Sequence, residues 1–266
     1  VLKLLQKEDI VPEKADRALF NNAPVLGAAV AIAGAAVVPF SASIVGADLE
    51  VGVLYLLAVG ALGVLPVFAA GWGSNNKFAL LGAMRAIAQS VSYEVPLVLA
   101  ALVPVILTGS MKLSEIVAFQ ASHHWLVVWP FFLGVPAFGL FMLAMLAESN
   151  RIPFDIPEAE SELVAGITTE YTGMKFALFY MAEYLHTLIA SAVAAALFLG
   201  GWDGPFAPGL HWMAAKTLGL FAFVYWVRWT LLRFRSDQLM ALCWRWLVPT
   251  GVALVLSAAL WVVFVG

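Results

Sequence analysis

The sequence has little charge and a single cysteine. Only 12% of its 266 residues are Asp, Glu, Lys or Arg and 63% are apolar, whereas soluble domains carry about 25% charged and about 45–50% apolar residues. This charge is too sparse to cover a water-exposed surface, and the 14 Lys and Arg form no basic block that would attract a nucleic acid. Cys243 alone supports neither a disulfide framework nor an iron–sulfur cluster, which needs about four thiolates. The composition predicts an integral membrane protein.

Motifs for nucleotide and metal binding are also missing. The chain contains neither a Walker motif nor G-x-G-x-x-G, which excludes nucleotide chemistry on this chain. Glu183 and His186 form Glu-x-x-His, half of the di-iron motif of helical bundles, but the sequence has no second copy. We therefore expect no metal site, and we expect His186 to be a packed or hydrogen-bonded side chain.

Seven apolar stretches are long enough to cross a bilayer as helices, which takes roughly 20 residues each. They are continuous and rich in Ala and Leu, whereas membrane strands would alternate. We expect an all-α, polytopic bundle of transmembrane helices that forms one domain over residues 23–266, after a charged cytoplasmic or interfacial segment over residues 1–22. The expected spans cover about residues 22–40, 51–71, 79–108, 125–147, 174–199, 210–232 and 241–265.

Basic residues are distributed unevenly between the two ends of the expected spans. Of the 14 Lys and Arg, only Lys112 and Lys216 fall on one side, which leaves 12 on the side of the N-terminal segment. Loops rich in Lys and Arg stay in the cytoplasm. We therefore expect a cytoplasmic N-terminal segment and a C-terminus on the opposite face of the membrane.

Acidic residues are concentrated in the expected cytoplasmic loop over residues 148–173. Asp155 and Glu158 resemble a capping box, which would begin a short helix over about residues 156–165. That helix would place Glu158 and Glu162 on one face, where two close carboxylates should have raised, coupled pKa values and exchange protons near neutral pH. The alternative is a charged loop that only faces water.

Two further acids, Glu94 and Glu183, lie well inside apolar runs. An ionisable group at such a depth costs roughly 2.5–3.5 kcal/mol or more, and by default it marks a path for ions or substrate. The alternative is pairing for structure alone. A charged cluster lies at the cytoplasmic end of the sixth expected span. It either anchors the helix on the cytoplasmic side or belongs to a site. Its members are Arg228, Arg233, Arg235 and Asp237.

Four blocks of sequence resemble a known family. The central block, Arg-Ile-Pro-Phe-Asp-Ile-Pro-Glu-Ala-Glu-Ser-Glu-Leu-Val-Ala-Gly over residues 151–166 with Thr-Glu-Tyr after it, closely resembles the signature of the NuoH family. These proteins are the quinone-site membrane subunits of bacterial respiratory complex I (NADH-quinone oxidoreductase). The resemblance extends over essentially the whole chain. The other blocks that carry it cover residues 7–12, 71–86 with 92–94, and 233–240.

The resemblance implies a division of labour among subunits in the bacterial inner membrane. Quinone is the substrate. An iron–sulfur cluster in a neighbouring peripheral-arm subunit reduces it, and FMN and the iron–sulfur clusters are held by partner subunits. Antiporter-like membrane subunits then move protons. The proton path that the resemblance implies in this chain consists of Glu94, Glu148, Asp155, Glu158, Glu160, Glu162, Glu170 and Glu183. Support of the quinone cavity or its loops is implied for Lys77, Arg85, Arg151, Arg228, Arg233, Arg235 and Asp237.

The chain departs from the family pattern in several places. The family has eight spans, so the resemblance implies one more helix before residue 1. Leu232 stands where the family usually has Pro, Ser236 where it usually has Tyr, and Ala61 near a position where some relatives carry Glu.

Three other functions stay open at this point. A complex-I-like enzyme fed by ferredoxin or another donor would have the same membrane subunit. A secondary transporter would usually show inverted repeats, and the two halves of the chain show none. A purely structural anchor gives no reason to bury Glu94 and Glu183.

Overall fold

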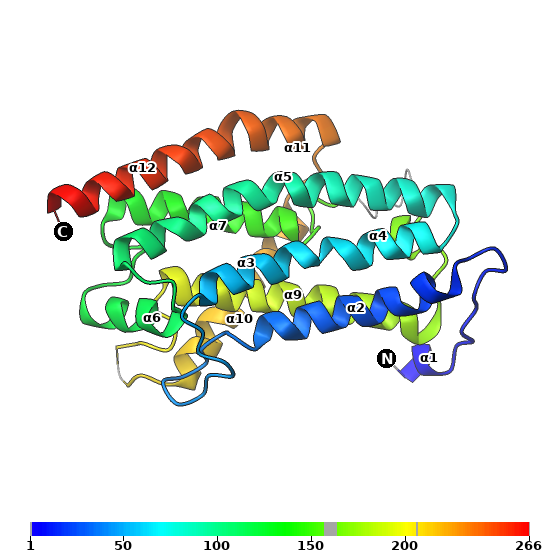
Figure 1. Cartoon of the computed structure of the whole chain (residues 1–266), viewed down its shortest axis with the longest axis horizontal. Coiled ribbons are helices and arrows are strands. Elements are labelled where there is room, and N and C mark those ends of the chain that lie inside the picture. The colour runs from blue at the N-terminus through cyan, green and yellow to red at the C-terminus, as the bar shows by residue number, and fades with distance from the viewer. Residues whose placement is uncertain (1, 157–163, 206, 266) are drawn as a thin grey trace.

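Long helices that run side by side make up most of the chain (Figure 1). The computed structural model describes residues 2–156, 164–205 and 207–265. In these ranges the helices are α1 (Leu2–Leu5), α2 (Arg17–Ala35), α3 (Gly52–Leu62), α4 (Val64–Gly73), α5 (Lys77–Thr108), α6 (Leu113–Ser122), α7 (Phe131–Glu148), α9 (Gly173–Phe198), α10 (Leu210–Thr230), α11 (Ser236–Leu242) and α12 (Val248–Val265), with a 3₁₀ turn η1 (Gly166–Thr168) and a π-helical segment η2 (Cys243–Leu247).

Six helical stretches within the described ranges have the length and apolar character needed to cross a membrane. They are α2, α3 with α4, α5, α7, α9, and the continuous stretch from α11 through α12. This confirms the all-helical, multi-span prediction. The remaining expected span, 210–232, forms helix α10 but is not among the six. It carries Lys216 and Arg228, and the count of seven spans stays a prediction.

Two helices begin at positions that differ from the expected ones. Helix α2 begins at Arg17 because the Asp16 carboxylate caps it, accepting hydrogen bonds from the backbone N–H groups of Ala18 and Leu19 at 3.0 and 3.3 Å. Its first turn therefore belongs to the segment expected to be interfacial. Helix α7 begins at Phe131, and the expected start at 125 was wrong. Pro130 restricts the backbone before it to extended conformations and so prevents an earlier start.

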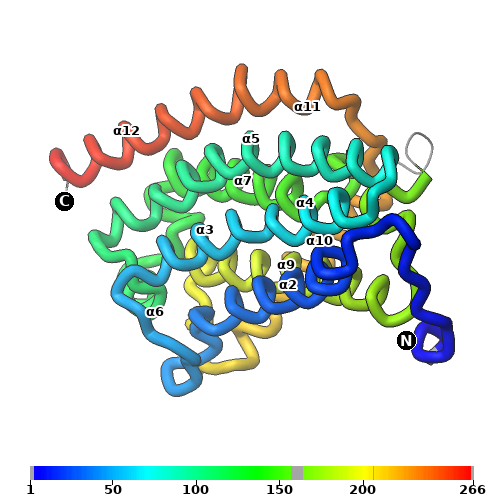
Figure 2. The backbone as a smooth tube through the Cα atoms, turned by 45° about the vertical axis from the view of Figure 1, so that its right-hand side comes forward, coloured from blue at the N-terminus to red at the C-terminus, as the bar shows by residue number. Residues whose placement is uncertain are grey.

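The N-terminal segment is tied to one end of the bundle, at the right in Figures 1 and 2. The Asp16 backbone N–H donates to the Gly73 carbonyl at 3.0 Å. The Lys175 ammonium pairs with Asp9 at 2.8 Å, and the Thr172 hydroxyl donates to the Glu8 carbonyl at 3.1 Å. These contacts join the segment to the end of α4 and to the start of α9.

At the opposite end of the bundle, carbonyl groups surround a partly buried ammonium group. Lys216 on α10 donates to the carbonyls of Leu199, Gly201 and Asp203, which lie just beyond the C-terminus of α9. Its Nζ also lies 4.4 Å from the centre of the Trp125 ring. A cation at a helix C-terminus satisfies carbonyls that the helix itself leaves unpaired. Lys216 thereby stabilises the end that also holds α6 and the tip of α12 (Figure 1).

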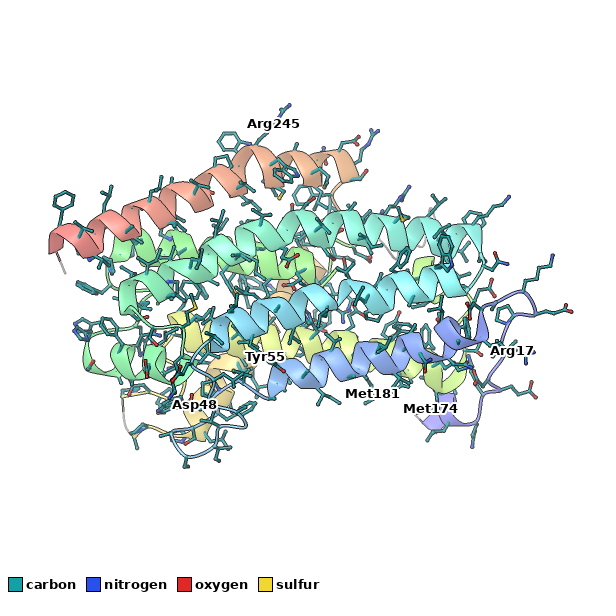
Figure 3. The ribbon with its side chains drawn as sticks, viewed as in Figure 1. Arg17, Asp48, Tyr55, Met174, Met181 and Arg245 are labelled. Carbon is teal, nitrogen blue, oxygen red and sulfur yellow. The ribbon has the colours of Figure 1, made fainter. Side chains whose placement is uncertain are left out.

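Charged residues mark the two ends and one side of the bundle (Figure 3). Arg17 lies at the end that holds the N-terminus, and Asp48 lies toward the other end. There Asp48 pairs with Lys112 at 2.8 Å, and this hydrogen-bonded pair lowers the pKa of Asp48 and raises that of Lys112. Arg245, which was counted among the basic residues of the cytoplasmic side, lies inside the long α11–α12 stretch and points away from the bundle.

Candidate functional site

Two neighbouring cavities lie inside the bundle. The larger has a volume of about 150 Å³ and is lined from α2, α3, α4, α5 and α9, together with Glu148 and the residues after α7. The smaller, of about 70 Å³, has mostly apolar walls from α2, α3, α5, α7 and α9. Glu94, Glu148 and His186 line both cavities, and Glu183 lines the larger one. The structure thus brings together three of the expected acids from three different helices. We call these four residues and the space between them the acid cavity.

Glu148 is the last residue of α7, and its side chain is 15% exposed. Its Oε1 lies 3.8 Å from Nε2 of His186 on α9. Gly60 on α3 makes room for this carboxylate, because a Cβ atom there would lie 3.0 Å from Glu148 Oε1. A larger side chain at position 60 would therefore displace the acid.

Arg151 pairs with Glu183, another acid of the acid cavity. Its Nε lies 3.3 Å from Oε1 of Glu183, and the Arg151 side chain is only 3% exposed. The guanidinium also lies 4.5 Å from the centre of the Tyr184 ring and 5.6 Å from that of Tyr225. A buried guanidinium needs such an ion pair and aromatic faces to offset the loss of water. Arg151 was expected to support the site, and it does contact a cavity-lining acid.

Hydrogen bonds hold the segment after α7 against α5. The Gln89 side-chain amide, which is 1% exposed, donates to the carbonyls of Ala147 and Phe154 at 2.7 and 2.8 Å. Tyr93 donates to the Leu239 carbonyl at 2.9 Å, and the Phe234 N–H donates to the Pro153 carbonyl at the same distance. These bonds fix the end of α7, and with it Glu148, relative to α5 and α11.

Glu170 and Tyr171 make contacts outside the acid cavity. Glu170 accepts a hydrogen bond from the Asn76 side chain at 2.6 Å. Tyr171 stacks on Phe20 with ring centres 4.2 Å apart and donates to the Phe20 carbonyl at 3.1 Å. Burial raises the pKa of Tyr171, so its hydroxyl remains a neutral donor at physiological pH. These contacts attach the turn before α9 to α2 and to the start of α5.

The remaining expected site residues fall into two groups. Asp155 lies in irregular backbone after α7 and lines neither cavity. Glu158, Glu160 and Glu162, with most of the expected short helix, lie outside the described residues.

The expected supporting cations also do not line the two cavities, although Arg151 contacts the cavity-lining Glu183. Lys77 is exposed at the start of α5, whereas Arg85, Arg228 and Arg233 are half-buried. Arg235 pairs with Asp237 at 3.0 Å, and both side chains are largely exposed.

Two residues at the cavities, His186 and Gly60, were not expected there. Gln89, whose hydrogen bonds hold the end of α7 in place, was not expected either. His186 was expected only to be packed, although its spacing of three from Glu183 predicts that both side chains share a helix face. Gly60 has no side chain that would reveal its role. Gln89 was a polar residue inside an apolar run, which was a usable signal, because a buried amide requires hydrogen-bond partners.

Comparison with known proteins identifies the family. A family model described as NADH dehydrogenase matches residues 1–259. The chain is 49% identical over 259 residues to the H subunit of the NADH-quinone oxidoreductase of Dehalococcoides mccartyi (strain CBDB1), over 97% of this chain and 71% of that protein. It is 45% identical over 276 residues to the corresponding protein of Syntrophotalea carbinolica, over 100% of this chain and 82% of that protein. The resemblance drawn from the four sequence blocks is confirmed. The chain belongs to the NuoH family of NADH-quinone oxidoreductases and is a multi-pass membrane subunit of complex I.

Proposed function

We propose that this subunit forms part of the quinone-binding cavity and that its acid cavity couples quinone reduction to proton translocation. One observation carries the coupling proposal: Glu94, Glu148 and Glu183 come from α5, α7 and α9 and gather around one internal space. Isolating each charge from water costs roughly 2.5–3.5 kcal/mol or more. A structural anchor gains nothing from that cost, whereas carboxyl groups that share a cavity with room for several water molecules can bind and release protons.

The quinone-binding part is proposed at the end of the bundle that holds the N-terminal segment. Three segments are proposed to contact the peripheral arm there, namely residues 1–22, 148–173 and 233–245. Support comes from the Phe234–Pro153 hydrogen bond, which joins the second segment to the third, and from the Thr172–Glu8 hydrogen bond, which joins the second to the first. A cluster in a partner protein supplies the electrons. The name of the relatives favours NADH over ferredoxin as their source.

The orientation of the chain is part of the proposal, with the N-terminal segment on the cytoplasmic side of the bacterial inner membrane. The 12-to-2 division of basic residues supports it. Cysteines introduced at Glu13 and His124, both exposed, are expected to react with a membrane-impermeant maleimide from opposite sides in intact cells and inverted vesicles. Native Cys243 is fully buried and is expected to stay unlabelled. Labelling of Glu13→Cys from the outside would contradict this orientation.

The coupling function is tested by Glu94→Gln in the assembled complex. The amide keeps the size of the side chain but cannot exchange a proton with Glu148. Quinone-dependent NADH oxidation is expected to fall about threefold to tenfold, because a positioned proton-transfer group contributes at least that much. NADH oxidation by an artificial acceptor at the peripheral arm should be unchanged.

The matched control is Glu115→Gln. Glu115 is exposed on α6 at the far end of the bundle and accepts a hydrogen bond from Ser110. It is expected to leave both activities unchanged. Equal quinone-dependent rates for the two variants would contradict a proton-transferring role of Glu94.

A further inference from the structure

We infer that His186 carries protons between the acids of the acid cavity. The inference rests on the proposed function and adds a residue to it. His186 lines both cavities, as do Glu94 and Glu148, and its Nε2 lies 3.8 Å from Glu148 Oε1. The side chain is 29% exposed, so the ring borders open space.

The surroundings of His186 hold acids on three helices. Glu94 faces the cavities from α5 and Glu148 from α7, while Glu183 lies one turn away on α9 itself. From α2 and α3 the walls common to both cavities are Val30, Ala31 and Gly60, which do not titrate. Among the described residues that line these cavities, His186 is the only imidazole, a side chain with one ring nitrogen that accepts a proton and one that donates a proton.

The two neighbouring pairs, Glu183–Arg151 and Glu148–His186, differ in whether both members can exchange a proton. Glu183 pairs with Arg151, whose guanidinium keeps its charge at any physiological pH, so that pair is a fixed one. Glu148 lies beside an imidazole, which can both accept and donate a proton. The Glu148–His186 pair is therefore the one in which both members can exchange a proton.

A proton transfer through this pair balances without any further reactant. Neutral His186 takes the proton of protonated Glu148 at Nε2, which leaves an imidazolium and a carboxylate. Rotation of the ring then carries Nε2 toward another carboxylate or a water in the cavity, and release of the Nε2 proton there, followed by rotation back, restores the neutral ring in its starting tautomer. A separation of 3.8 Å is longer than a hydrogen bond. One water molecule or a small side-chain movement spans it, and a cavity of about 150 Å³ has room for several waters.

The test is His186→Gln in the assembled complex, with the quinone-dependent rate measured across about pH 5.5–8.5. Glutamine keeps hydrogen-bonding groups in the cavity but does not titrate. We expect a rate about threefold to tenfold lower at neutral pH. We also expect the loss of the limb of the pH profile that the histidine produces. A merely structural histidine would lower the amount of complex without changing the shape of that profile. His124→Gln, at an exposed position, is the matched control and should leave rate and profile unchanged.

The outcomes separate this inference from the proposed function. A wild-type pH profile for His186→Gln, together with an impaired Glu94→Gln complex, would overturn the role of His186 and leave the coupling proposal standing. Wild-type behaviour of both variants would overturn both. His186→Asn provides a second amide variant. If neither amide variant assembled, His186 would be a packing residue, and the inference would be wrong.

Discussion

Replacing Glu148 by Gln is expected to reduce quinone-dependent NADH oxidation about tenfold or more in the assembled complex, because a positioned proton-transfer group contributes about 10²–10⁴-fold. Glu148 occupies the centre of the acid cavity, since it lines both cavities and lies next to His186. The amide fits the space that Gly60 leaves open but holds no exchangeable acid proton. Proton uptake linked to quinone reduction would therefore stop at this residue.

The measurement compares two electron acceptors on the same membranes. Reduction of a water-soluble acceptor at the peripheral arm should match the wild-type rate, which shows that the complex is assembled and that NADH oxidation itself is intact. A proportional fall of both rates would instead indicate lost assembly. Retention of the full quinone-dependent rate by the Glu148→Gln complex would contradict the proposed role of this residue.

The second large effect is expected for Arg151→Met, which should strongly reduce the amount of assembled complex. The change leaves Glu183 without its partner at 3.3 Å and removes the guanidinium from the Tyr184 and Tyr225 rings. Breaking a fully buried ion pair by removing one partner costs about 3–5 kcal/mol, and the cost is expected to be smaller here because Glu183 is 22% exposed. Even part of that cost matters against the roughly 5–15 kcal/mol by which folded proteins are stable. Native gels and thermal unfolding of the purified complex measure the loss.

Two further variants establish the cause of that loss. Arg151→Met combined with Glu183→Gln also removes the carboxylate charge that faced Arg151 and should recover part of the stability. Arg235→Met breaks the pair with Asp237, but those side chains are 80% and 75% exposed, so it should have little effect, since exposed pairs contribute about 0–1 kcal/mol. Equal losses for Arg151→Met and Arg235→Met would show that burial of the pair does not matter.

The spans were largely predictable because apolar runs of sufficient length have few alternatives to a helix. The expected span 174–199 corresponds to α9 at Gly173–Phe198, and 79–108 corresponds to α5 at Lys77–Thr108. The errors lie at the ends of the helices, because a single capping side chain or proline there determines where a helix begins. Asp16 begins α2 earlier than hydropathy indicates, and Pro130 delays the start of α7.

The candidate site was less predictable than the fold. Glu94 and Glu183 stood out because their burial is costly, and the structure does bring them to one cavity with Glu148. The partner of each acid did not follow from the sequence, because Arg151 and His186 meet their acids through the packing of α7 and α9. Glu170 belonged to the acids concentrated between residues 148 and 183, and it accepts a hydrogen bond from Asn76, so its place in the proton path stays a prediction.

The central claim is that the acid cavity conducts the protons that quinone reduction drives. The most direct measurement is NADH-driven proton translocation by purified complex in liposomes, for the double variant Glu94→Gln/Glu148→Gln and for Glu115→Gln. The account predicts that the double variant loses uncoupler-sensitive proton translocation whereas Glu115→Gln retains it. Translocation by the double variant at the rate of Glu115→Gln would contradict the account.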